Sequence, residues 1–154
     1  MRVVKKTRLW IVAGVIASSL WSAGCDEKLS SVAGPTPTLE PTYSSISREI
    51  FTASDSSGRR ACTACHTNVG RNPAGGLNLL TEVGHAQLVD VDSVTNRGSK
   101  RVVPGDPDNS ILIKKLEGAP GMVGQRMPIG GPPYLTAGQI LIIRRWIQEG
   151  ALNN

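Results

Sequence analysis

The chain has 154 residues, which is enough for one domain and too few for two domains of ordinary size. Its formal net charge is +5, but four of its 17 basic residues lie in residues 1–24, which contain none of its 12 acidic residues. The rest of the chain is therefore nearly balanced in charge. The composition gives no reason to expect a nucleic-acid partner, since the basic excess belongs to the N-terminal segment.

The N-terminal segment has the pattern of an export signal. A basic start, with Arg2, Lys5, Lys6 and Arg8, is followed by an apolar run over residues 9–23 and by Ser22-Ala23-Gly24-Cys25. This resembles a bacterial lipoprotein signal peptide, except that Ser22 stands where that family usually has leucine. The resemblance implies that residues 1–24 are removed, that Cys25 carries lipid, and that the protein is anchored at the periplasmic face of a membrane in the bacterial cell envelope. The alternatives are an ordinary cleaved signal with a free Cys25 and an uncleaved anchor.

Residues 25–41 are predicted to form a tether. From residue 26 onward they are polar, contain three prolines and have no periodic apolar pattern, which is typical of disordered linkers. The folded domain is therefore expected over residues 42–154. Its first helix is predicted over residues 44–52, with Ile46, Ile50 and Phe51 at helical spacing.

A polar loop leads from this helix to Cys62-Thr63-Ala64-Cys65-His66, which is a C-x-x-C-H motif. This motif is the attachment signature of a c-type haem. Two thiols at this spacing each add to one haem vinyl group, and the histidine that follows at once is placed to ligate the iron. The sequence therefore predicts one covalently bound haem c, with Cys62 and Cys65 as its anchors and His66 as an axial ligand.

Three other interpretations of the two cysteines fit less well. A thioredoxin-like redox pair needs a βαβ context, whereas the neighbourhood here is rich in glycine and proline. A closed zinc site needs more ligands than Cys25 and His85, the only other cysteine and histidine, can supply. A structural disulfide is the third alternative. If Cys25 carries lipid and the motif carries haem, no thiol is left over in an oxidising compartment.

The middle of the chain alternates between loops and short helices. Pro73 and the pair Gly75-Gly76 break regular structure within residues 72–77. A helix containing His85 is predicted over residues 81–88, and a short strand-like piece over residues 101–103. A further helix is predicted over residues 109–117, because its apolar residues share one side and Gly118 ends it.

The last helix has the clearest signals. Thr136 and Gln139 have the spacing of a capping box, and Gly150 stands where a C-terminal cap is expected. Its apolar stripe consists of Ile140, Ile143 and Ile147. Beyond the signal segment the chain has one tryptophan, Trp146, and few other large side chains. A domain of this size would bury a poor core unless a porphyrin helped to fill it.

The segment over residues 121–133 is predicted to be a loop that presents Met127. Pro128 disfavours helix at the preceding residue, and a thioether is a suitable sixth ligand for haem iron. Met127 is therefore the predicted second axial ligand. Met122, His85 and an open sixth position are the alternatives, and a Met127 that only packs against the ring is another.

In this order of motifs the chain resembles the class I mono-haem cytochrome c family, and in particular short bacterial cytochrome c domains. The resemblance covers about residues 44–151. The matching pieces are Ile50-Phe51, Cys62 to His66, Gly75-Gly76-Leu77, Val103-Pro104-Gly105, Met127-Pro128, Trp146-Ile147 and Gly150-Ala151.

The resemblance implies a small all-α fold with long Gly/Pro-rich loops around one haem, with the first and last helices crossing. It implies that His66 and Met127 ligate the iron. It also implies that a loop carbonyl, that of Pro73 in this chain, accepts the proton on the far nitrogen of His66.

The expected function is the transfer of single electrons between extracytoplasmic redox proteins, without catalysis. One alternative is a haem-containing accessory subunit of a dehydrogenase or oxidase complex, and another is a sensor. A peroxidase would need an open iron and a distal acid-base group, for which His85 is the only spare histidine. The candidate cations for a docking rim are Lys114, Lys115, Arg126, Arg144 and Arg145, although scattered solvated charges are the simpler interpretation.

Overall fold

The structure is a computed structural model that describes residue 36 and residues 38–154. The predicted signal segment 1–24 and Cys25 lie outside the described residues, as does most of the predicted tether. Among the residues that it does describe, no helix is both long enough and apolar enough to cross a membrane.

The first predicted helix is present as two consecutive helical pieces. The α-helix α2 (Tyr43–Ile46) continues as the π-helical segment η1 (Ser47–Phe51). Thr42 caps the start, because its hydroxyl accepts the N–H of Ser45 at 3.3 Å. Ile46, Ile50 and Phe51 are all buried, so the apolar edge expected from their spacing is the face that packs inward.

The two middle helices lie close to where the sequence predicts them. The helix α3 (Thr81–Leu88) has the predicted bounds, and α4 (Ile111–Glu117) starts two residues later than predicted. The delay arises because Ser110 is fully buried, where its hydroxyl accepts the N–H of Val103 and donates to the carbonyl of Asp106. Gly118 ends α4 in the left-handed conformation, as expected for a glycine at this position.

The strand-like piece predicted over residues 101–103 is wrong. The chain there makes only isolated bridges, which pair Val102 with Val89 and Val103 with Asp106. Val102 is buried in the core, which accounts for the strand-like composition. The ladder stops at once because Pro104 has no N–H to donate.

The C-terminal helix α5 (Ala137–Gln148) has the predicted capping box. The backbone N–H of Thr136 donates to the Gln139 amide oxygen at 2.9 Å, and the N–H of Gln139 donates to the Thr136 hydroxyl at 3.2 Å. Gly150 follows the helix with a positive φ of 100°. The predicted stripe is confirmed as the buried face of α5, together with the fully buried Trp146.

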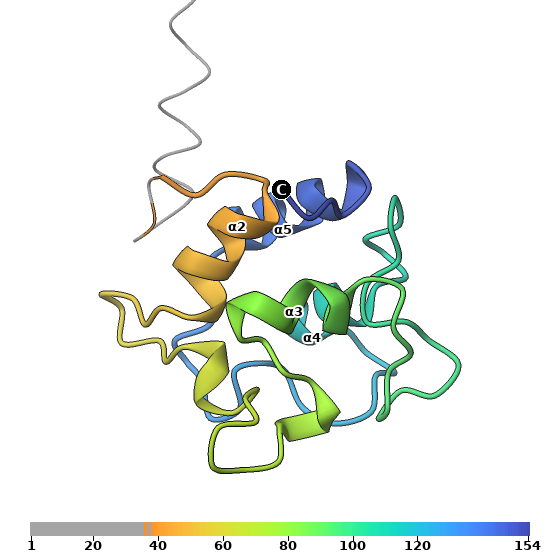
Figure 1. The fold of residues 1–154 in the computed structure, drawn as a ribbon, viewed down its shortest axis with the longest axis horizontal. Helices are drawn as coiled ribbons and strands as arrows, with labels where there is room; N and C mark the ends of the chain where they lie inside the picture. The colour runs from red at the N-terminus through yellow and green to blue at the C-terminus, as the bar shows by residue number, and fades with distance from the viewer. Residues whose placement is uncertain (1–35, 37) are drawn as a thin grey trace, which may run out of the picture.

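Helices gather in one half of the molecule and loops in the other. Figure 1 shows α2 beside α5, with the C-terminus between them, and α3 next to α4 below. The last residues of the chain are held by hydrogen bonds from residues 43–44 and from Trp146. The N–H of Tyr43 donates to the Asn154 side chain, and Trp146 Nε1 donates to the Leu152 carbonyl. The opposite half of the fold consists of loops and two short 3₁₀ helices, η2 (Cys62–Ala64) and η3 (Ala74–Gly76).

The predicted boundary between tether and domain lies too late in the chain. Leu39 belongs to the hydrophobic core, and the Gln139 side chain donates to the hydroxyl of Thr36 at 3.1 Å. The packed part of the chain therefore includes residues 36 and 39, inside the predicted tether 25–41. The polar, proline-rich composition did not indicate that this segment packs on the domain, because a single leucine is enough to anchor it.

Candidate functional site

The C-x-x-C-H motif forms a single tight turn. Within η2 the N–H groups of Cys65 and His66 both donate to the carbonyl of Cys62, at 3.1 and 2.9 Å. Cys62 is partly buried, Cys65 is exposed, and neither is in a disulfide. All three side chains line the same cavity. The turn therefore presents two free thiols and one imidazole to a common space.

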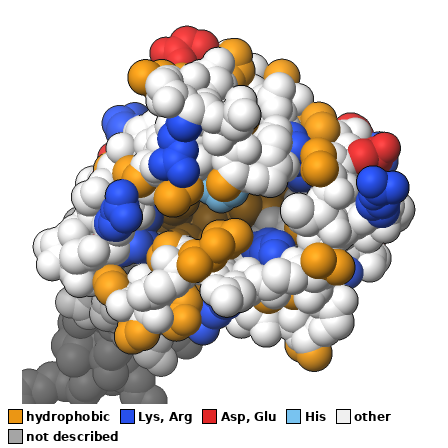
Figure 2. Space-filling view, turned by 90° about the horizontal axis from the view of Figure 1, so that it is seen from below, with side chains coloured by type: hydrophobic (Ala, Val, Ile, Leu, Met, Phe, Trp, Pro, Cys, Tyr) orange, Lys and Arg blue, Asp and Glu red, His pale blue; other side chains and the backbone are white. Residues whose placement is uncertain are grey.

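This cavity has a volume of about 580 Å³, within the range of roughly 300–1,000 Å³ that is usual for small-molecule and cofactor sites. Figure 2 shows it as a hollow with apolar side chains and a histidine inside and with Lys and Arg around it. Its apolar wall is formed by Phe51, Leu77, Leu79, Leu88, Ile111, Leu112, Leu116 and Leu135. A flat, largely apolar ring system therefore suits the wall.

Met127 also lines this cavity, at a position held by helix α4. Its backbone N–H donates to the carbonyl of Lys115 at 2.9 Å, and Arg126 Nε donates to the carbonyl of Leu116 at 2.8 Å. The Arg126 guanidinium also stacks on the Tyr134 ring at 4.0 Å. The loop that carries Met127 is thus fastened on both sides of the methionine. It brings a thioether to the cavity from a point 61 residues beyond His66 in the sequence.

The alternative ligands do not line the cavity. Met122 lines a separate hollow of about 190 Å³ with Asn96, Lys114 and Pro120 among its neighbours. His85 lies beside the rings of Tyr43 and Trp146, and its Nε2 donates to the carbonyl of Ala151 at 2.8 Å. The structure therefore places Met127, and neither alternative, in the cavity with Cys62, Cys65 and His66.

The carbonyl that faces the far nitrogen of His66 belongs to Ala74, and the prediction of Pro73 is wrong by one residue. His66 Nδ1 lies 3.0 Å from the Ala74 oxygen. The carbonyl of Pro73 instead accepts the N–H of Gly76 at 3.0 Å, because it closes the 3₁₀ turn of η3. A carbonyl only accepts, so Nδ1 carries the proton and Nε2 keeps its lone pair for a metal.

The surroundings of His66 keep its imidazole neutral. Burial lowers the pKa of His66, and the positive charge of Arg101 lowers it further. The hydrogen bonds to the backbone of Ala74 and Leu77 act in the opposite direction but do not outweigh these effects. At neutral pH the side chain is therefore in the form that can donate a lone pair to a metal.

A buried ion pair supports the turn just before the motif. Arg59 and Asp55 have side chains only 1% and 5% exposed, and Arg59 Nε donates to Asp55 at 2.9 Å. Burial acts to raise the pKa of Asp55, but hydrogen bonds from Ser57 and Arg59 lower it more. Arg59 also donates to the carbonyl of Ile50 and so ties the motif to the end of η1.

The same arginine lies close to the first cysteine of the motif. Burial raises the pKa of Cys62, while the charge of Arg59 lowers it in part. The Cys62 sulfur lies 3.6 Å from the carbonyl of Ile50, which also accepts from Arg59. Cys62 is therefore held at a fixed position, and its thiol is protonated at neutral pH.

Two buried cations in the cavity wall, Arg59 and Arg101, were not predicted from the sequence; they are 1% and 7% exposed. Arginine is a common residue and neither stands in a recognisable motif, so their burial depends on tertiary packing alone. Of the cations proposed for a docking rim, only Lys115 lines the cavity. Arg144 pairs with Asp108 and Glu117, and Arg145 pairs with Glu149.

Comparison with known proteins gives no match: no family model matches the chain, and no curated protein or solved structure is similar to it. Residues 36 and 38–154 also contain no group of three or more His, Cys, Asp or Glu side chains placed to hold a metal ion. A haem iron needs no such group, because the porphyrin supplies four of its ligands and the protein only the axial two.

Proposed function

We propose that this protein is a membrane-tethered c-type cytochrome that carries single electrons between extracytoplasmic redox proteins. The observation that supports it is the meeting of Cys62, Cys65, His66 and Met127 at one cavity of about 580 Å³. Two thiols can hold a haem covalently, and an imidazole and a thioether can supply the two protein ligands of its iron. The proposal includes the all-α, cytochrome c-like fold, since helices enclose one side of this cavity.

Each residue has a separate part in the proposed site. Cys62 and Cys65 would anchor the haem through thioether bonds, His66 would bind the iron through Nε2, and Met127 would close the other axial position. Bound haem supplies one-electron chemistry at the iron. The carbonyl of Ala74 orients the imidazole, and the attachment of residues 126 and 127 to α4 fixes the thioether. Because both side chains are held in place, they would keep the change in geometry on electron transfer small.

The apolar wall and the exposed side chains at the cavity edge also suit a carrier. Val123 and Ile129 line the cavity and are 59% and 66% exposed, so the cavity opens beside an apolar surface. Arg60 and Arg71 line it as exposed cations. Another redox protein can approach such an edge closely, as electron transfer between proteins requires.

A peroxidase is supported less well by the same geometry. General acid-base catalysis at a haem needs a titratable side chain on the distal side. In the described part of the chain, the cavity wall has no Asp or Glu, and its one histidine is His66. His85, the residue considered for this role, donates to the carbonyl of Ala151 and lies against Tyr43 and Trp146.

The proposal is tested by a spectrum and a redox titration of the purified full-length protein. We expect a low-spin haem spectrum and a single reversible one-electron transition, with oxidation and reduction curves that superimpose. A high-spin oxidised spectrum, together with turnover of hydrogen peroxide that falls in His85→Ala, would contradict the carrier and favour the enzyme. A protein purified without haem after coexpression with a haem-attachment system would contradict both.

The proposed lipid anchor predicts a change in localisation when Cys25 is replaced. The native protein should partition into the membrane or detergent fraction, and Cys25→Ala should release it or block processing of the signal segment. The measurement is immunoblotting of fractions together with mass spectrometry of the mature N-terminus. Ser31→Ala is a matched control in the adjacent segment and should leave the distribution unchanged. An unmodified cysteine at the mature N-terminus would show that the protein is not lipidated.

A further inference from the structure

Arg101 is a buried cation that no acidic side chain of the described residues neutralises. Its residue is only 7% exposed, and it forms no ion pair among residues 36 and 38–154. Arg59, the other buried arginine of the cavity wall, is neutralised by Asp55. Burial of an unpaired charge is unfavourable, as the lowered pKa of Arg101 also indicates. The two arginines therefore differ in whether an acidic side chain of the described residues neutralises the guanidinium.

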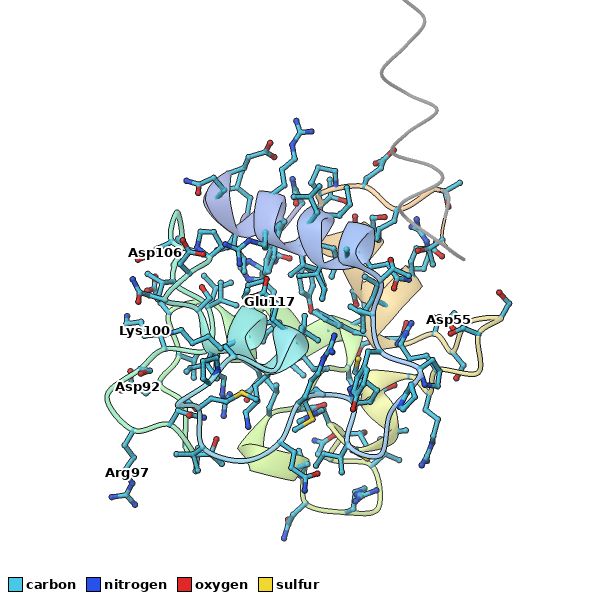
Figure 3. The ribbon with its side chains drawn as sticks, turned by 180° about the vertical axis from the view of Figure 1, so that it is seen from behind. Asp55, Asp92, Arg97, Lys100, Asp106 and Glu117 are labelled. Atoms are coloured by element: carbon cyan, nitrogen blue, oxygen red, sulfur yellow. The ribbon has the colours of Figure 1, made fainter. Side chains whose placement is uncertain are left out.

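Neutral oxygens hold the Arg101 guanidinium in place. Nη1 donates to the carbonyl of Gln87 at 2.7 Å, and Nη2 donates to the carbonyls of Gly76 and Gly75 at 3.0 and 3.3 Å. These bonds fix its position without cancelling its charge. The acids of the neighbouring loop lie elsewhere: Asp90 pairs with Lys100, and Asp92 is at the outer edge of the molecule in Figure 3.

The guanidinium also lies on the His66 side of the cavity. It is hydrogen-bonded to η3, the turn whose Ala74 carbonyl faces His66 Nδ1. Its side chain is part of the same cavity wall as His66. A group bound at His66 Nε2 would therefore sit within the field of a charge that water screens poorly.

We propose that Arg101 is a positioning residue whose buried charge, unpaired with any acidic side chain of the described residues, raises the reduction potential of the haem. The inference rests on the proposed function, since it requires a haem bound at His66. Oxidised iron carries one more positive charge than reduced iron, so a fixed cation nearby disfavours the oxidised form. The hydrogen bonds to η3 keep this cation at a constant place relative to the axial histidine.

The two contributions of Arg101 have opposite signs and can be separated. A firmer Nδ1 hydrogen bond to Ala74 makes the imidazole more electron-donating, which favours the oxidised iron and lowers the potential. The positive charge raises the potential. Arg101→Lys keeps the charge and loses the planar fork, whereas Arg101→Gln loses the charge. If the effect of the charge is the larger one, Arg101→Gln lowers the midpoint potential and Arg101→Lys does not.

The first experiment is a redox titration of the holoprotein at neutral pH. For Arg101→Gln we expect the ratio of oxidised to reduced protein at a fixed solution potential to rise at least about tenfold, which is ~59 mV for a one-electron couple. For Arg101→Lys the midpoint potential should change by less than this ~59 mV. Arg71→Gln is the control: Arg71 lines the same cavity but is exposed, so solvent screens its charge and the midpoint should move much less.

A second variant tests the same idea without disturbing the arginine. The Gln87 side-chain oxygen lies 3.4 Å from Arg101 Nη1, so Gln87→Glu places a carboxylate of nearly the same shape beside the guanidinium. That carboxylate is ionised next to arginine and supplies the missing counter-charge. We expect the midpoint to fall in the same direction as in Arg101→Gln. Gln87→Glu therefore tests the effect of the Arg101 charge on the midpoint potential even if Arg101→Gln does not fold.

The outcomes separate this inference from the proposed function. A fall in potential in Gln87→Glu, and in Arg101→Gln where it folds, with little change in Arg101→Lys and Arg71→Gln, supports the role of the buried charge. An unchanged midpoint in Gln87→Glu overturns it. An equal fall in Arg101→Lys or in Arg71→Gln overturns it too. If the unaltered protein carries no covalent haem, the proposed function itself fails, and this is established before any variant is titrated.

Discussion

Replacing Met127 with alanine should convert the haem from low-spin to high-spin and open the iron to carbon monoxide. The methionine lines the cavity from a loop anchored to α4, and alanine leaves no sulfur to reach the iron. We expect the weak sulfur-to-iron charge-transfer band to disappear completely, and the reduced protein to bind carbon monoxide stoichiometrically where the native protein resists it. The potential should also fall, because a thioether ligand raises it. Absorption spectroscopy of oxidised, reduced and carbonyl forms measures all of these changes.

Met122→Leu is the matched control for this experiment. Met122 is in the same loop but lines a separate hollow, so its replacement should leave the spectrum, the potential and the resistance to carbon monoxide unchanged. Changes in Met122→Leu with none in Met127→Ala would reverse the assignment of the ligand. A native protein that is already high-spin would show that neither methionine closes the iron.

The double replacement of Cys62 and Cys65 by alanine should abolish covalent haem. Both thiols line the cavity and neither is in a disulfide, so both are available for thioether bonds. In the native protein the haem should stay with the polypeptide after denaturation and acid-organic extraction, and in the variant none should remain. The variant should also be poorly folded, because it leaves about 580 Å³ unfilled in a domain whose total stability is only ~5–15 kcal/mol. Haem staining after denaturing electrophoresis and circular dichroism report these two effects.

Two further variants make this result specific. Cys62→Ala and Cys65→Ala alone should each keep one thioether bond, and so retain haem in smaller yield. Ala64→Ser changes a residue between the two cysteines without removing a thiol and should behave as the native protein. If acid-organic extraction removes all haem from the native protein, the attachment is not covalent and the interpretation of the motif is wrong.

The sequence by itself determined the local features of this chain. The bounds of α3, the capping box of α5 and the glycine that ends α4 depend on residues close together in the chain, so spacing was enough to predict them. The apolar face of α5 was predictable for the same reason, since helical periodicity already selects the side that packs inward. The C-x-x-C-H motif is local too, because one turn carries both thiols and the imidazole.

Tertiary structure decided the features that join distant segments. Only the folded chain separates Met127, in the cavity, from Met122, in another hollow, because both stand in one Gly/Pro-rich loop without periodicity. The carbonyl that faces His66 belongs to Ala74 and not to Pro73, because the conformation of the loop around η3 decides which carbonyl points at the imidazole.

The burial of single side chains and the pairing of their charges could not be predicted from the sequence either. Leu39 lies in a segment with the composition of a linker, yet it belongs to a core that is built from segments far apart in the chain. Arg59 and Arg101 stand in no recognisable motif. The folded chain buries both beside the cavity, and within its described residues only Arg59 is paired with an acidic side chain. Burial and pairing are properties of the neighbours that folding brings together, and spacing along the chain does not encode them.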